Sequence, residues 1–141
     1  GYGRVGRQVA RDLRAAGERY VVIDERPEHG EDARHVGVRF IEGSASDDEA
    51  LEDAGIERAR AVVACVDSDA ENVFVVLSAR QLNVGIPIIA RASNIDAEPK
   101  LLRAGATRVR RRRPDLTRAA WPAGCYPWGG FCVYAQKPLS G

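Results

Sequence analysis

Methionine and long apolar runs are both missing from this chain of 141 residues. A membrane-spanning helix needs about 18 or more consecutive apolar residues, and no stretch of the sequence approaches that length. A signal-peptide pattern is absent as well. Because there is no initiator methionine, we expect the natural start to lie upstream of Gly1, and the sequence leaves open whether a membrane segment precedes it.

Cysteine is scarce, and the three cysteines are Cys65, Cys125 and Cys132. An odd number without a short paired spacing argues against a disulfide framework and against a zinc site. Cys65 lies in an apolar run, which predicts a small buried hydrophobic residue. These features favour a reducing, cytoplasmic setting, and we expect no bound metal.

A large charge of either sign is missing too. The formal net charge is +1, while 29% of the residues are charged and 45% are hydrophobic. Those proportions are typical of a soluble globular protein, and the length suits one domain with its own core. The near-neutral balance gives no reason to expect a nucleic-acid partner.

The sequence does contain a glycine-rich turn, GYGRVG, over residues 1–6. In the G-x-G-x-x-G pattern of dinucleotide-binding proteins, the first glycine makes a tight turn and the second lets a pyrophosphate approach the backbone. The third lets the following helix pack on the sheet. These roles would fall to Gly1, Gly3 and Gly6. Arg4, inside the turn, is expected either to contact a phosphate or to be a simple exposed arginine.

The spacing of apolar residues predicts alternating helices and strands. Capping boxes at Ser46–Glu49 and Ser68–Glu71 predict two helix starts, and the apolar stretch Val73–Leu77 is expected to pack mostly on the sheet. The expected helices cover residues 4–16, 28–36, 46–54, 68–82 and 100–104, and the expected strands cover 20–23, 38–41, 61–66, 86–90 and 107–109.

This alternation predicts an α/β fold, with a Rossmann-like, doubly wound parallel sheet in a three-layer αβα arrangement. The strand order 3-2-1-4-5-6 would place the first strand at the centre of the sheet, directly before Gly1. The sequence does not contain that strand, so we expect the first, central strand to be missing from the fold.

Asp24 follows the expected strand 20–23 and lies 18 residues beyond Gly6, close to the about 20 expected for the acid that binds an adenosine ribose. A carboxylate there can accept two hydrogen bonds from the ribose hydroxyls. Asp24 and Glu25 would repel a 2′-phosphate, which disfavours NADP, although the neighbouring Arg26 leaves that point open.

Several segments, in order, resemble the RCK N-terminal domain, also called TrkA-N or KTN. They are the glycine turn, VVID at 21–24, EGSAS at 42–46, AGI at 54–56, Asp69 with Asn72, AR at 79–80, ARA at 90–92 and KLLRAGA at 100–106. The resemblance implies a cytoplasmic domain, at the inner face of the membrane, that regulates a prokaryotic potassium channel or transporter. It also implies pairing with a second copy and sensing of NAD(H) or ATP/ADP without enzymatic turnover.

The same resemblance implies which residues border the nucleotide. They comprise the phosphate turn, the ribose acid and its neighbour, the loop beside the adenine, the end of a strand opposite the turn, and two polar positions: Gly1, Gly3, Arg4, Val5 and Gly6; Asp24 and Glu25; Gly43, Ser44 and Ala45; Cys65, Val66 and Asp67; Asn72 and Arg91. Arg91 would reach a terminal phosphate, or else form a salt bridge. The family usually has Gly-Asp-Ala at 43–45, and the loss of that acid leaves the choice of nucleotide open.

Residues 110–141 depart from the family, with a run of arginines at 110–113 and then a segment rich in Trp, Pro and Gly. We therefore divide the chain into a nucleotide-binding domain at 1–109 and an atypical tail at 110–141 without helical or strand periodicity. An aberrant end of the reading frame and a genuine tail are both open interpretations.

The leading hypothesis is a nucleotide-sensing domain that controls potassium transport through a pore fused upstream or present as a separate subunit. The alternative is the cofactor-binding half of an NAD-dependent oxidoreductase, which would need a substrate domain and an acid–base group. His29 and His35 are the only histidines, and both are expected at the surface. A nucleic-acid binder would depend on the basic tail alone, so we expect no nucleic-acid partner.

Overall fold

A computed structural model describes residues 1–111 and 133–136 of the chain. Its helices are α1 (Arg4–Ala15), α2 (Pro27–His35), α3 (Asp48–Ala54), α4 (Asp69–Leu82) and α5 (Ala97–Ala104), with a short 3₁₀ helix at Ile56–Arg58. Its strands are β1 (Tyr20–Asp24), β2 (Arg39–Glu42), β3 (Ala59–Ala64), β4 (Ile88–Arg91), β5 (Arg108–Arg110) and β6 (Val133–Gln136). Each helix and strand expected from the sequence is present, with bounds shifted by a few residues.

The strands form one sheet in the order β2-β1-β6-β3-β4-β5. The pairs β1–β2, β3–β4 and β4–β5 are parallel, as the alternation of helices and strands predicts. The doubly wound α/β fold is therefore confirmed.

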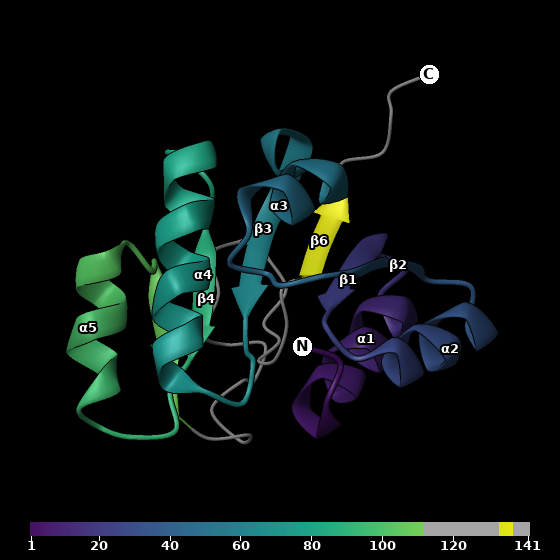
Figure 1. Cartoon of the computed structure of the whole chain (residues 1–141), viewed down its shortest axis with the longest axis horizontal. Helices are drawn as coiled ribbons and strands as arrows, with labels where there is room; N and C mark the ends of the chain where they lie inside the picture. The colour runs from purple at the N-terminus through teal and green to yellow at the C-terminus, as the bar shows by residue number, and fades with distance from the viewer. Residues whose placement is uncertain (112–132, 137–141) are drawn as a thin grey trace.

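The strand expected before Gly1 is missing, as predicted, but another segment fills the centre of the sheet. Residues 133–136 form β6, which pairs antiparallel with β1 on one side and β3 on the other (Figure 1). Without it, both neighbours would present a row of unpaired N–H and C=O groups inside the sheet, which is costly. The tail was expected to lack a strand, and that expectation was wrong: the segment begins with Val133 and Tyr134, two residue types that favour strands. Of the rest of the tail, residue 110 ends β5, and residues 112–132 and 137–141 lie outside the described residues.

Two hydrophobic cores lie on opposite faces of the sheet and give the three layers. Val21 and Ile23 of β1 belong to the larger core, together with buried residues of α3, α4 and α5. Val22, which points the other way, belongs to a smaller core with α1 and α2. This alternation follows from the two-residue period of a strand. Figure 1 shows α4 and α5 lying side by side over the larger core.

One of the two predicted serine caps forms. Ser68 Oγ accepts the backbone N–H of Glu71 at 3.3 Å and caps α4 as predicted. The other prediction was wrong, since α3 begins at Asp48 after the N-cap residue Asp47, which makes no side-chain cap. The hydroxyl of Ser46 instead lies 2.8 Å from the hydroxyl of Ser44, in the loop before the helix. That local contact competes with the cap.

The apolar stretch of α4 is only partly buried. Val75 and Val76 pack into the larger core, but Phe74 and Leu77 are 61% and 46% exposed. The helix therefore has an apolar outer side as well as the expected inner one. Among the described residues, no helix combines the length and the apolar character that crossing a bilayer requires.

Candidate functional site

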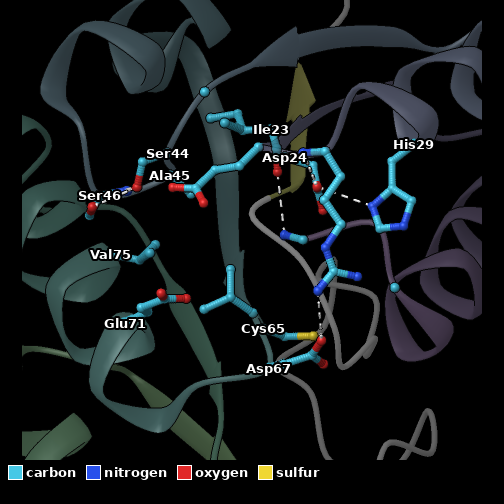
Figure 2. A pocket seen from close by; sticks show the side chains of 16 residues that line it. Ile23, Asp24, His29, Ser44, Ala45, Ser46, Cys65, Asp67, Glu71 and Val75 are labelled. Atoms are coloured by element: carbon cyan, nitrogen blue, oxygen red, sulfur yellow. Dashed lines mark hydrogen bonds and ion pairs between the residues drawn. The ribbon is translucent and has the colours of Figure 1, made fainter.

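A cleft of about 180 Å³ opens where the carboxyl ends of β1 and β3 meet the glycine turn. In open α/β sheets this edge, where the chain winds to either side, is the usual place for a ligand. Figure 2 shows Asp24 and His29 on one side of the cleft, Ser44, Ala45 and Ser46 at another edge, and Cys65 and Asp67 below.

Most of the predicted site residues meet in this cleft. Those that line it are Gly1, Gly3, Asp24, Glu25, Gly43, Ser44, Ala45, Cys65, Val66 and Asp67. The predicted residues that do not line it are Arg4, Val5, Gly6, Asn72 and Arg91. The loops after β1, β2 and β3 therefore converge as the sequence predicts, whereas the α1 residues beyond Gly3 lead away from the cleft.

Asp24 is only 8% exposed, and its carboxylate is held by the protein itself. Oδ2 accepts the backbone N–H of Tyr2, and Oδ1 accepts the backbone N–H of Arg26 at 2.8 Å. Burial alone would raise the pKa of Asp24, but these two hydrogen bonds and the nearby His29 outweigh it and hold the pKa below its usual value. Asp24 is therefore an ionised residue that ties the glycine turn to the end of β1.

His29 is buried, at 7% exposure, which corrects the expectation that both histidines lie at the surface. Its Nδ1 lies 3.1 Å from Asp24 Oδ1, at an angle outside hydrogen-bond geometry, so the contact is electrostatic when the ring is protonated. The ring also meets the Tyr2 ring edge-on, with centroids 6.2 Å apart. The first turn of α2 thus packs against Asp24, because α2 begins shortly after the end of β1.

The start of α1 is open to an anion. Gly3 is its N-cap residue, no side chain caps it, and its first turn contains no acidic residue. A helix N-terminus presents unpaired N–H groups and a positive dipole end, which attract phosphate or carboxylate. A Cβ added to Gly3 would have as its nearest neighbour Asp67 Oδ1, at 4.0 Å, so this glycine borders open space in the cleft.

The loop after β2 is joined to the end of β1. The backbone N–H of Gly43 donates to the carbonyl oxygen of Asp24 at 3.0 Å. The Ser44 and Ser46 hydroxyls, at the cleft edge, lie in hydrogen-bond contact with one another. This loop therefore presents two hydroxyls at the edge of the cleft.

Asn72 is fully buried and lies behind the cleft, contrary to the expectation that it borders it. Its Oδ1 accepts the backbone N–H of Val66 at 2.8 Å. Its amide nitrogen donates to the carbonyl oxygens of Val66 and Arg91, at 3.1 and 3.0 Å. Asn72 therefore fixes the loop after β3 against the end of β4, and its influence on the cleft is indirect.

Arg91 forms the salt bridge that was one of its two expected roles. Its Nη1 lies 3.6 Å from Asp67 Oδ1, and the Nη2 of Arg26 lies 3.8 Å from Asp67 Oδ2. The carboxylate of Asp67, which follows β3, thus lies between two guanidinium groups, that of Arg26 after β1 and that of Arg91 at the end of β4.

Six cleft residues were not among the predicted site residues: Ile23, Arg26, His29, Ser46, Glu71 and Val75. Glu71 and Val75 lie four residues apart on α4, a spacing that places both on one side of a helix. That spacing, and the proximity of Ile23 and Arg26 to Asp24, were available signals. No local sequence signal predicted the position of His29, because that position depends on how α2 packs against β1. In the described part of the chain, no group of three or more His, Cys, Asp or Glu residues is arranged to hold a metal ion.

Comparison with known proteins gives a consistent family. The TrkA-N domain matches residues 1–111. Potassium channel protein 1 of Methanocaldococcus jannaschii is 39% identical over 111 residues, which are 77% of this chain and 33% of the relative. The glutathione-regulated potassium-efflux system protein KefC of Escherichia coli is 31% identical over 111 residues, 79% of this chain and 18% of the relative. The chain thus spans about a third or less of these relatives' length.

Solved structures agree. The TrkA-N domain of the inner membrane protein ybaL from Escherichia coli has a TM-score of 0.77 at 32% identity, covering 84% of this chain and 88% of that one. The GsuK channel bound to NAD has a TM-score of 0.66 at 27% identity, covering 77% and 20%. The Shewanella denitrificans Kef C-terminal domain in its AMP-bound form has a TM-score of 0.71 at 29% identity, covering 82% and 69%.

Proposed function

Because the chain belongs to the TrkA-N domain family, we propose that its cleft binds an adenine nucleotide, NAD(H) or ATP/ADP, and does not turn it over. The proposal depends on one observation: Gly3 and Asp24 line the same cleft. Gly3 marks the uncapped N-terminus of α1, and Asp24 contributes a buried, ionised carboxylate. These two features suit a phosphate and a ribose respectively.

The cleft suggests a direction for the ligand. Phosphate would lie over Gly1 and Gly3, and the base would lie toward the loop of Gly43, Ser44 and Ala45. A volume of about 180 Å³ is smaller than the about 300–1,000 Å³ of typical ligand pockets. We infer that the cleft encloses one mononucleotide half and that any second half lies at its open edge. The related GsuK channel bound to ADP and the Kef domain in its AMP-bound form support binding of a mononucleotide.

We infer that the biological role is regulation of potassium transport, at the cytoplasmic face of a membrane, by coupling nucleotide binding to a pore or transporter. The kinship with potassium channel and potassium-efflux proteins supports this role. The pore would be fused to this domain or supplied by a separate subunit. Nucleotide binding would shift the balance between two arrangements of paired domains, which requires different affinity for each arrangement.

Pairing of two copies would use the outer side of α4 and α5. Phe74 and Leu77 on α4 are exposed, as is Leu102 on α5, and these helices pack against each other. Exposed apolar side chains gathered on one face are typical of protein–protein contacts. Sedimentation of the purified chain, with Phe74→Asp as the variant, would test it: loss of a dimer on substitution supports pairing here, and a dimer unchanged by it contradicts this surface.

The oxidoreductase alternative receives less support from the cleft. The one histidine that lines it, among the described residues, lies against Asp24 at the ribose end. A dehydrogenase needs an acid–base group beside the nicotinamide, at the opposite end of the dinucleotide.

Calorimetric titration of the 141-residue chain tests the proposal, with NADH, ATP, ADP, AMP and adenosine as separate ligands. Saturable binding of at least one nucleotide is expected, with no consumption of NADH when small aldehydes and ketones are added. Absence of binding by all five would contradict the proposed function. Hydride transfer to a carbonyl compound would favour the oxidoreductase alternative instead.

A further inference from the structure

The carboxylate of Asp67 stands where an anionic ligand is expected. It follows β3, and its Oδ1 lies 4.0 Å from the position a Cβ on Gly3 would take, beside the uncapped start of α1. It also faces two guanidinium groups, with Arg26 at 3.8 Å and Arg91 at 3.6 Å. In Figure 2 the Asp67 carboxylate lies at the lower edge of the cleft, and a dashed line joins it to an ion-pair partner.

Both ion pairs of Asp67 are easy to break. The side chain of Asp67 is 77% exposed, Arg26 is exposed and Arg91 is partly buried, so water screens the charges. Exposed pairs at such long distances contribute little to stability. Phosphate competes well for arginine because it carries more charge and accepts two parallel N–H bonds from one guanidinium.

Asp67 differs from the other carboxylates of the cleft. Asp24 is buried and held by backbone N–H groups, so it cannot leave its position. Glu25 and Glu71 line the cleft as well, but no ion pair joins either of them to Arg26 or Arg91 in the described residues. Asp67 is thus the acid that is both paired to the two arginines and free to rotate into solvent.

We propose that Asp67 is a resident counter-ion that occupies the phosphate position in the absence of ligand and sets the affinity for phosphate groups. The proposal rests on nucleotide binding in this cleft. When a nucleotide enters, the Asp67 side chain turns outward, and Arg26 and Arg91 bind the phosphate that replaces it. Before binding, Asp67 links the loops after β1 and β3 to the end of β4. After binding, the ligand links the same three segments.

The test is the affinity of Asp67→Asn for adenosine, AMP and ADP, measured by calorimetry at low salt. Removing one negative charge close to the phosphates should strengthen AMP binding about threefold and ADP binding about tenfold, and should leave adenosine unchanged. Glu98→Gln is the matched control, because Glu98 forms an exposed 3.3 Å ion pair with Arg111 outside the cleft. It should leave all three affinities unchanged. Glu71→Gln controls for cleft charge in general.

Two arginine variants complete the design. Arg26→Gln and Arg91→Gln should each weaken ADP binding severalfold without affecting adenosine, and Asp67→Asn should gain less when Arg91 is already replaced. Weaker ADP binding by Asp67→Asn would overturn the proposal, since Asp67 would then be a ligand-binding acceptor. Equal gains in Asp67→Asn and Glu71→Gln would overturn it too. If wild type binds ADP and Asp67→Asn does so identically, only this inference fails. The proposed function fails as well if wild type binds none of NADH, ATP, ADP, AMP and adenosine.

Discussion

Asp24 Oδ2 accepts the backbone N–H of Tyr2, so the acid at the end of β1 holds the glycine turn in its position beside the cleft. The sequence pattern assigns Asp24 to a ribose, and the structure adds a second role for it. Because both oxygens already accept backbone hydrogen bonds, a ribose hydroxyl would use a remaining lone pair. Under the proposed function, folding and ligand binding would therefore share one carboxylate.

Replacing Asp24 with Asn should destabilise the protein at pH 7 by about 1.5–3 kcal/mol, since two backbone N–H groups lose a charged acceptor.

The pKa of Asp24 is held below its ordinary value of 3.8, so its ionised form stabilises the fold above that pH. This contribution is lost as the pH falls below 3.8 toward the lowered pKa. Urea denaturation at pH 7 and in steps from pH 5 to pH 2 should show a shallower acid dependence for Asp24→Asn than for wild type. An equally steep acid dependence in both would contradict this assignment.

Gly3→Ala should impair nucleotide binding without unfolding the protein. The added Cβ meets no atom closer than 4.0 Å, and the φ of Gly3 is −76°, which alanine adopts readily. The methyl group would instead stand between the helix N-terminus and an approaching phosphate. We expect a melting temperature within a few degrees of wild type and an ADP affinity at least tenfold lower. Unchanged ADP affinity would show that the phosphate lies elsewhere.

Asn72→Ala should destabilise the fold by about 2–4 kcal/mol. The substitution removes three hydrogen bonds from a fully buried site and leaves the N–H and carbonyl of Val66 without their partner. Urea denaturation measures the loss. Asn94→Ala, at an exposed position, is the control and should change stability by less than about 0.5 kcal/mol. Similar losses in the two variants would mean that the Asn72 amide is not a structural link.

Gly105→Ala should cost about 1–3 kcal/mol. Gly105 ends α5 at φ +114°, and an added Cβ would lie 3.0 Å from Arg80 Cγ. Arg80 could not simply move aside, because its guanidinium donates to the carbonyl oxygens of Gly105 and Ile86. Gly85→Ala is the matched control, since its Cβ would meet nothing within 4 Å. Thermal unfolding should separate the two variants, and equal melting temperatures would contradict the conformational argument.

Local patterns predicted most of the fold. The apolar spacing in residues 4–16 and the continuous run at 20–23 predicted α1 and β1, and the Ser68–Glu71 pattern predicted the cap that forms on α4. These signals work because they depend on neighbours along the chain. The same kind of pattern failed at Ser46, where a hydroxyl two residues away competes with the cap.

Features that depend on contacts between distant parts of the chain could not be predicted from local patterns. The pairing of residues 133–136 between β1 and β3 depends on two open strand edges that are far away along the chain. The burial of His29 against Asp24, and that of Asn72 behind the loop after β3, depend on how helices dock on the sheet. Asp67 was predicted to border the cleft, but its two arginine partners come from the ends of separate strands.

Nucleotide binding in the cleft is tested most directly by an amide ¹H–¹⁵N titration of the whole chain with ADP and, separately, with NADH. If the cleft binds the nucleotide, saturable shifts should appear at the backbone amides of Gly3, Ser44 and Val66, and should be absent or much weaker in Gly3→Ala. Shifts confined to other surfaces, such as the outer side of α5, or no shifts with either ligand at millimolar concentration, would contradict nucleotide binding in this cleft.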